Sequence, residues 1–228
     1  MKASSTLGAA PDSVFRIWRN RLRIEYEAAA LFAQLGKELA QHYGKHDEVV
    51  RLCEGAEEEE LSHAKMCIEI IKYSGEAPAF NYTRKKIQLG PENLTSEQKI
   101  LYTSLALSCV TETLSTALLT EMQNAAEPGL IKDTVHQILR DEVKHSRIGW
   151  AELNRCHQNQ NLTWVQPYIP LMLKEALQAD IQPMLTRQEA KDDLSAWGIL
   201  SPLDASLIME NTITQIISPG LQRYGLKI

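Results

Sequence analysis

The sequence predicts an all-α protein built on a four-helix bundle, and three observations lead to this prediction. Four long segments repeat apolar residues at helical spacing, whereas no segment shows a sustained alternation of apolar and polar residues. Short, long and short connections separate the four segments, which is one of the standard topologies of such a bundle. With 228 residues, 44% of them hydrophobic, the chain can bury a core without disulfides or a structural metal.

The first two helices are expected at about 11–43 and 47–73 as an antiparallel pair, because only a short connection separates them. Asp12 or Ser13 could cap the start of the first helix, and Gly44 provides a typical helix end. These two segments form the first half of the expected bundle.

A long connection at about 76–93 separates this pair from the third helix. Helices in bundles are more often joined by about two to eight residues, so we expect this segment to cross between the two pairs. Thr95 and Gln98 have the spacing of a capping box at the start of the third helix, which ends before Pro128. The fourth helix is expected from about 130 to 156.

The last third of the chain is expected to form shorter helices. Its prolines divide it into segments at about 168–180, 186–196 and 203–217. These segments are too short and too close together to be a separate domain. We therefore expect a single domain, 1–228, in which the helices of 157–228 cover a four-helix core at 12–156.

Composition and charge exclude several classes of protein. The net charge of −5 argues against a partner such as nucleic acid or an anionic membrane, since both need basic surfaces. No run approaches the ~20 apolar residues of a membrane span, and the start of the chain does not resemble a signal peptide. The four cysteines form no C-x-x-C pair and are expected as reduced thiols, which is typical of a cytoplasmic protein.

Each of the four expected helices carries a glutamate in the middle of the stripe that should be apolar. These glutamates are Glu25, Glu60, Glu112 and Glu142, and two of them are followed after three residues by a histidine, His63 or His145. Four carboxylates in a dry core would repel one another, and each buried ion costs several kcal/mol. Either the acids are protonated, or counter-charge such as two divalent cations neutralises them.

The Glu-x-x-His spacing places both side chains of a pair on one helical face, where the glutamate can bridge two metal ions and the histidine can bind one. In the first half of the chain, Glu25 precedes Glu60 by 35 residues. In the second half, Glu112 precedes Glu142 by 30 residues, so the two halves repeat one unit. The alternative is that the pairs lie on solvated faces. Glu27 is a second candidate on the first helix, but only Glu25 shares the apolar stripe.

The segments Glu60-Leu-Ser-His63-Ala and Asp141-Glu142-Val-Lys-His145-Ser resemble the second and fourth helix motifs of the ferritin-like di-iron carboxylate superfamily. The resemblance covers about residues 12–156. It implies a ferritin-like four-helix bundle with its long crossover between helices 2 and 3. It also implies that Glu60 and Glu142 bridge two metal ions. The terminal ligands would then be Glu25 with His63 and Glu112 with His145.

Further roles follow from the same resemblance. Asp141, beside a ligand, would orient an imidazole N–H; a surface charge on the fourth helix is the alternative. Thr116, one turn after Glu112, matches a threonine of oxygen-activating di-iron hydroxylases whose hydroxyl delivers protons; ordinary packing is the alternative.

The acids at 57–59 are expected to be solvated, because only one residue of the run 57–60 can face the core. Small residues near the ligands leave room for a substrate pocket, with the C-terminal helices as its wall or lid. These residues are Ala29, Gly36, Ala56, Cys109 and Gly149.

Carboxylate and imidazole ligands suit two iron ions, with manganese as the alternative. The resemblance implies a non-haem di-iron oxygenase or oxidase that activates O2, takes electrons from an external donor and oxidises a small organic substrate. Arylamine N-oxygenases of the superfamily carry a further histidine where this chain has Ile138, so N-oxygenation is not supported. The alternatives are a ferroxidase or iron-storage protein, a peroxide-scavenging ferritin-like protein and a non-catalytic helical module. A monomer or homodimer favours the enzyme, whereas a large cage favours storage.

Overall fold

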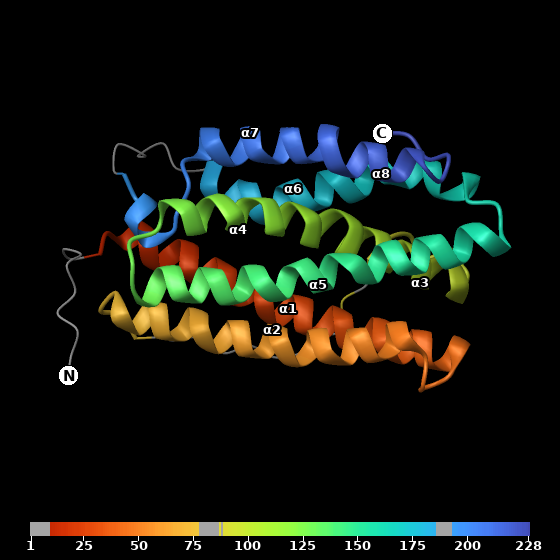
Figure 1. Ribbon diagram of the computed structural model, residues 1–228, viewed down its shortest axis with the longest axis horizontal. Helices are drawn as coiled ribbons and strands as arrows, with labels where there is room; N and C mark the ends of the chain where they lie inside the picture. The colour runs from red at the N-terminus through yellow and green to blue at the C-terminus, as the bar shows by residue number, and fades with distance from the viewer. Residues whose placement is uncertain (1–9, 78–86, 88, 186–192) are drawn as a thin grey trace.

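The computed structural model describes residues 10–77, 87, 89–185 and 193–228. Within these ranges every regular element is a helix and none is a strand, so the prediction of an all-α protein is confirmed. Four long rods dominate the structure (Figure 1). They are α1 (Asp12–Tyr43), α2 (Glu48–Tyr73), a continuous rod of α3 (Ser96–Ser104), η1 (Leu105–Glu112) and α4 (Thr113–Ala125), and α5 (Leu130–Asn159).

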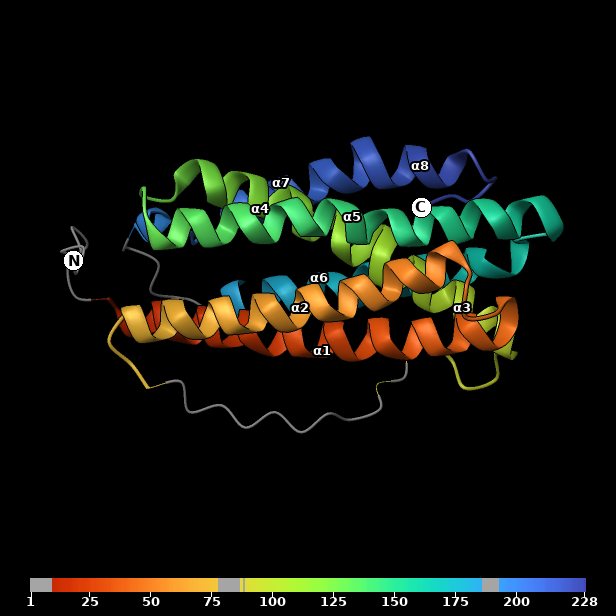
Figure 2. The same ribbon diagram turned by 60° about the horizontal axis from the view of Figure 1, so that its bottom comes forward.

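The four rods pack side by side along their length. α1 packs against α2, and α5 packs against α2 on one side and against η1 and α4 on the other. Figure 2 shows α1 and α2 paired in one layer, with α4 and α5 in a second layer above them. The end of α2 and the start of α3 lie at opposite ends of the rods in both views. This packing brings the middle parts of α1, α2, η1 and α5 together in the interior.

Local sequence explains where these helices begin and end. The capping box predicted at the start of α3 is present, because Oγ1 of Thr95 accepts the backbone N–H of Gln98 at 3.2 Å and the Gln98 side chain accepts that of Thr95 at 3.0 Å. Gly44 ends α1 with a φ of 92°, a conformation that favours glycine. The predicted cap of α1 is wrong: Asp12 is already helical, and the N-cap residue is Pro11, which has no side-chain hydrogen bond to offer.

The third rod is not a regular α-helix, because its middle, η1, is a π-helix of eight residues. π-helical turns bond residue i to i+5 and change which side chains share a face. Oγ1 of Thr111 follows the same spacing and donates to the carbonyl oxygen of Ala106 at 3.0 Å. The apolar stripe expected from Leu101 to Leu119 is buried at every position except Thr116, which is half-buried.

The C-terminal third forms a second set of shorter helices. These are η2 (Thr163–Tyr168), α6 (Ile169–Leu185), η3 (Ser195–Trp197), α7 (Pro202–Thr212), η4 (Ile213–Ile217) and α8 (Ser218–Gln222). α6 packs against η1, α1 and α7, and α7 packs against α4. These helices therefore cover one long side of the four rods, and Figure 1 shows α2 on the opposite side.

Two of the predicted C-terminal helices need correction. Of the segment predicted at 186–196, residues 186–192 lie outside the described part, residues 193–194 are not helical, and the rest belongs to the 3₁₀ turn η3. The helix predicted at 203–217 continues to Gln222. Pro219 does not end this helix: it lies in α8, two residues after the π-helical turns of η4.

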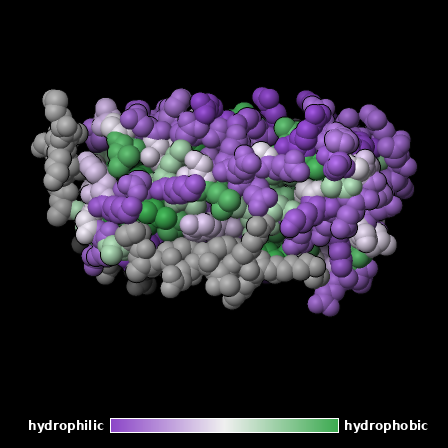
Figure 3. Space-filling view, turned by 90° about the horizontal axis from the view of Figure 1, so that it is seen from below, coloured by the Kyte–Doolittle hydropathy of each residue, from purple (hydrophilic) through white to green (hydrophobic). Residues whose placement is uncertain are grey.

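Most of the buried residues are apolar, and polar residues predominate on the surface shown in Figure 3. On the face shown in Figure 3, hydrophilic residues predominate and hydrophobic residues form small groups. None of the helices in the described ranges is long and apolar enough to cross a membrane. All four cysteines are buried and free, as expected for reduced thiols.

Candidate metal centre

Six acidic and histidine side chains converge in the interior of the four rods. Glu25 comes from α1, Glu60 and His63 from α2, Glu112 from the end of η1, and Glu142 and His145 from α5. All six are at most 3% exposed. They form two overlapping groups, Glu25, Glu60, His63 and Glu142 in one, and Glu60, Glu112, Glu142 and His145 in the other. Within each group, the ligand atoms all lie within 4.8 Å of one another, so the structure brings together all six residues predicted as metal ligands.

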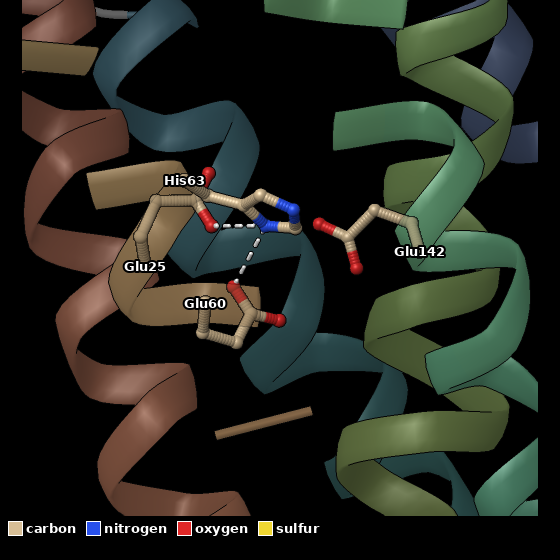
Figure 4. Close-up of side chains that lie close together, drawn as sticks. All are labelled: Glu25, Glu60, His63 and Glu142. Carbon is tan, nitrogen blue, oxygen red and sulfur yellow. Dashed lines mark hydrogen bonds and ion pairs between the residues drawn. The ribbon is translucent and has the colours of Figure 1, made fainter. Parts of the chain in front are cut away.

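Two of the six residues, Glu60 and Glu142, belong to both groups. A bridging carboxylate must reach two metal ions, and these shared positions are where such ligands have to lie. Figure 4 shows the first group: Glu25 and Glu60 lie beside the His63 ring, and Glu142 points toward that ring from the opposite helix. Each of these two buried groups could therefore hold a metal ion.

Both imidazole rings turn Nδ1 toward the carboxylates. Nδ1 of His63 lies 3.3 Å from Oε2 of Glu60 and 3.6 Å from Oε2 of Glu25. Nδ1 of His145 lies 3.0 Å from Oε1 of Glu60 and 3.1 Å from Oε2 of Glu142. Nδ1 is therefore the nitrogen of each ring that is placed to bind a metal.

An acid behind each ring contacts its outer nitrogen. Nε2 of His63 lies 3.3 Å from Oδ2 of Asp141, as expected for an acid that orients an imidazole. Nε2 of His145 lies 2.9 Å from Oε2 of Glu59. The expectation that Glu59 is solvated is therefore wrong, because its side chain is only 31% exposed and reaches across to α5. The sequence carried a signal for this role, since Glu59 and Asp141 each directly precede a glutamate of the cluster.

Lys144 joins these two acids on the outer side of the cluster. Its Nζ lies 2.9 Å from Oδ1 of Asp141 and also forms an ion pair with Glu59. Burial alone would raise the pKa of Asp141, but hydrogen bonds from its neighbours, chiefly Lys144 and Gln137, lower the pKa to about 2. Asp141 is therefore an ionised carboxylate that can accept a hydrogen bond from His63.

Arg21 is a further residue of the site that was not predicted from the sequence. Its Nη2 lies 3.0 Å from Oε1 of Glu142 and 3.2 Å from Oγ of Ser115, and its Nε forms an ion pair with Glu25. Burial alone would raise the pKa of Glu25, but the charge of Arg21 holds that pKa well below its usual range. The available signal was a basic residue one turn before Glu25 on the same helical face. Arg21 places a fixed positive charge inside the carboxylate cluster.

Protons also offset the charge of the metal-free cluster. Burial raises the pKa of Glu112 well above its usual value and raises that of Glu60 to about 7. Burial opposes protonation of the two histidines, but the carboxylates in contact with them raise the pKa of His63 to about 11 and that of His145 to about 10. A metal ion bound here would therefore compete with protons for the same side chains.

A cavity of about 170 Å³ reaches this cluster. Arg21 and the four cluster glutamates line its inner end, and most of its walls are apolar side chains of α1, η1 and α6. The half-exposed Glu27 and the exposed Glu175 line its outer part. Met172 and Ala176 on α6 form part of the wall, so a C-terminal helix does contribute to the pocket, as predicted.

The small residues predicted to leave room for a pocket do not line this cavity. They are Ala29, Gly36, Ala56, Cys109 and Gly149. Gly149 allows close helix packing instead, because a Cβ atom there would lie 2.3 Å from the carbonyl oxygen of Ser104. Gly36 likewise lies against Cys53 of the neighbouring helix, whereas the cavity lies between α1, η1 and α6.

The structure does not bring Thr116 to the cavity wall. Its hydroxyl donates a hydrogen bond to the carbonyl oxygen of Glu112 at 2.8 Å. Thr111 and Ser115, which lie one helical turn apart, line the cavity instead. The geometry at Thr116 therefore fits ordinary packing, the alternative to a catalytic role.

No family model, no curated protein and no solved structure matches the chain. The donor set of the site is therefore the basis for identifying its chemistry. Carboxylate oxygens and imidazole nitrogens suit metals such as iron and manganese rather than metals that prefer sulfur ligands.

Proposed function

We propose that this protein is a non-haem di-iron oxygenase or oxidase, with a ferritin-like four-helix core and the long crossover between α2 and α3 that belongs to it. The observation that supports this proposal is the pair of overlapping ligand groups that share Glu60 and Glu142. Each group offers carboxylates and one imidazole nitrogen, a set that suits iron, with manganese as the alternative. Two divalent ions would also balance the charge of the four carboxylates.

When bound, the two iron ions would supply the reduction of O2 and the oxidation of a small organic substrate, with electrons from an external donor. Glu60 and Glu142 would bridge the ions, Glu25 and His63 would complete one site, and Glu112 and His145 would complete the other. Asp141 and Glu59 keep the two imidazole rings turned so that Nδ1 faces inward. The apolar walls of the cavity hold the substrate next to the cluster and exclude water from it.

A ferroxidase or iron-storage function is the second candidate. Glu27 and Glu175 place acidic side chains in the outer part of the cavity, but Arg23 pairs with Glu27 and Glu175 is exposed, so their attraction for iron ions is weak. The apolar walls between these acids and the cluster favour an organic substrate over a hydrated ion.

Metal content tests the proposal directly. Protein loaded anaerobically with Fe(II) is expected to hold about two iron ions per chain by elemental analysis, as the paired ligand groups require. Glu60→Gln and Glu142→Gln should each lower this content, because each removes a charge that both ions need. Glu58→Gln is the matched control, since Glu58 is exposed on the same helix as Glu60.

The reduced, iron-loaded protein should then consume O2 as a monomer or homodimer. An iron content near zero after anaerobic loading would overturn the proposal. Continued uptake of iron well beyond two ions per chain, in a large cage on size-exclusion chromatography, would establish the storage function instead.

A further inference from the structure

The guanidinium of Arg21 lies at the inner end of the cavity, and its hydrogen bonds to the described residues involve only part of its N–H donors. Among the described residues that line the cavity, Arg21 is the only basic one. Its Nε pairs with Glu25, and its Nη2 contacts Glu142 and Ser115. Nη1 has no hydrogen-bond partner among the described residues. A guanidinium presents five N–H donors in a fork that matches a carboxylate, so Arg21 has donors left for a ligand.

Metal binding would weaken the present ion pairs of Arg21 and so make more of its N–H donors available to a ligand. Both carboxylate partners of Arg21, Glu25 and Glu142, are predicted metal ligands, and a carboxylate that binds a metal ion shares less of its negative charge with the guanidinium. Two divalent ions together with Arg21 bring five positive charges against four carboxylates. The two ions would balance the four carboxylates and leave the charge of Arg21 without a counter-charge on the cavity side, since the outer acids Asp141 and Glu59 and their partner Lys144 do not line the cavity.

We propose that Arg21 binds the anionic group of the substrate, and that the substrate is a small carboxylate with an apolar body. This inference rests on the proposed function, because Glu25 and Glu142 pair with Arg21 in the metal-free form and would bind the metal ions in the loaded form. Ile24, Leu31, Leu107 and Met172 supply apolar walls for the body of such a molecule. An apolar cavity of about 150 Å³ holds a benzene ring. The cavity of about 170 Å³ therefore has room for one ring or a short aliphatic chain.

The acids in the outer part of the cavity do not oppose this assignment. Glu27 is ion-paired with Arg23, so its charge is already matched. Glu175 is exposed on α6, where water and salt screen its charge. The Arg21 side chain is only 14% exposed, and a charge in this drier environment acts more strongly on a bound anion.

Three ring compounds of similar size and different charge test the inference: benzoate, benzyl alcohol and benzylamine. Isothermal titration calorimetry measures their binding to the whole protein, both metal-free and loaded anaerobically with Fe(II), with the iron content determined on the same samples. The loaded protein should bind benzoate at least about tenfold more tightly than the other two compounds. The metal-free protein should lack this preference, because Glu25 and Glu142 occupy the guanidinium of Arg21 there.

Variants of Arg21 separate its contribution from direct binding of the anion to the metal. In the loaded protein, Arg21→Met should lower the affinity for benzoate at least about tenfold and leave that for benzyl alcohol within about twofold. Arg21→Lys keeps the charge without the fork and should give an intermediate affinity. If Arg21→Met does not fold, Arg21→Lys and the unsubstituted protein still decide the outcome. Arg16→Met removes an exposed base of the same helix that does not line the cavity, and it is the matched control.

Benzoate binding that survives Arg21→Met at unchanged iron content would overturn the inference and leave the proposed function intact. Equal affinities for the three compounds, or no binding by the loaded protein, would overturn it in the same way. If iron does not load at all, the proposed function fails and this inference fails with it.

Discussion

Nε2 of His145 on α5 lies 2.9 Å from Oε2 of Glu59 on α2. The same relationship recurs with the helices exchanged, since Nε2 of His63 on α2 lies 3.3 Å from Oδ2 of Asp141 on α5. Each helix therefore supplies the acid that orients the histidine of the other. The two halves of the candidate metal centre are held in register by this exchange.

The outer acids should matter for metal affinity. Asp141→Asn and Glu59→Gln are each expected to weaken metal binding by about tenfold to a hundredfold, because the outer hydrogen bond orients the imidazole and raises its basicity. Competition with a chromophoric chelator measures the affinity. Glu58→Gln, next to Glu59 but exposed, should have no effect. Unchanged affinity in both variants would show that these acids do not position the ligands.

Lys144 holds together two acids whose like charges repel each other. Lys144→Met should therefore lower metal affinity, by less than about tenfold because its ammonium group is partly exposed. Arg140→Met is the control: Arg140 lies 3.6 Å from Oδ1 of Asp141 and its side chain is 65% exposed, so its loss should change little. The same chelator competition compares the two variants, and equal effects would refute a special role for Lys144.

Arg21 should stabilise the metal-free protein more than the metal-loaded protein. Arg21→Gln leaves Glu25 and Glu142 without their buried partner, and breaking such a pair costs about 3–5 kcal/mol. When metal ions are bound, they supply the missing positive charge and the loss should be smaller. Urea unfolding of both forms measures the difference. An equal loss in the two forms would contradict this role.

Stability should depend on pH in the metal-free form. The pKa values of His63 and His145 rise from 6.5 to about 11 and about 10 in the folded protein. A raised pKa means that the folded state binds the proton more tightly than the unfolded state. This contribution is complete below about pH 6.5 and is lost as the pH rises through 10 to 11. The metal-loaded protein, whose histidines bind as neutral ligands, should lack this loss, and thermal unfolding at pH 6 to 10 compares the two forms.

Replacing either of two glycines by alanine should change the stability of the protein, in opposite directions for the two positions. A Cβ atom at Gly149 would lie 2.3 Å from the carbonyl oxygen of Ser104 and 2.8 Å from Sγ of Cys109, so Gly149→Ala should destabilise the protein by about 1–3 kcal/mol. A Cβ atom at Gly55 on α2 meets no atom within 4 Å. Gly55→Ala should therefore stabilise the protein by about 0.5–1 kcal/mol, because alanine is the better helix former. Urea midpoints of the two variants check both signs.

Much of the candidate site was predictable because it follows rules that act along a single helix. His63 follows Glu60 by three residues, which places both side chains on one face, and the apolar stripe shows that this face is buried. The same rule separates Glu25, at 1% exposed, from Glu27, whose side chain is 37% exposed.

Other parts of the site depend on contacts between residues that are distant in the sequence. Arg21 meets Glu142, 121 residues away, and Lys144 meets Glu59, 85 residues away. No local pattern specifies such a contact. The π-helix η1 is a further case, because helical periodicity in the sequence assumes regular α-helical turns.

The sequence by itself determined the all-helical class, the four long helices and the six side chains that interrupt their apolar stripes, because periodicity shows which face of each helix is buried. Only the tertiary structure decided which charged groups meet at the cluster. It also decided that Ser115 rather than Thr116 lines the cavity and that this cavity lies between α1, η1 and α6. These features depend on how the rods are rotated and packed against one another, and that rotation is settled by the whole core rather than by any one helix.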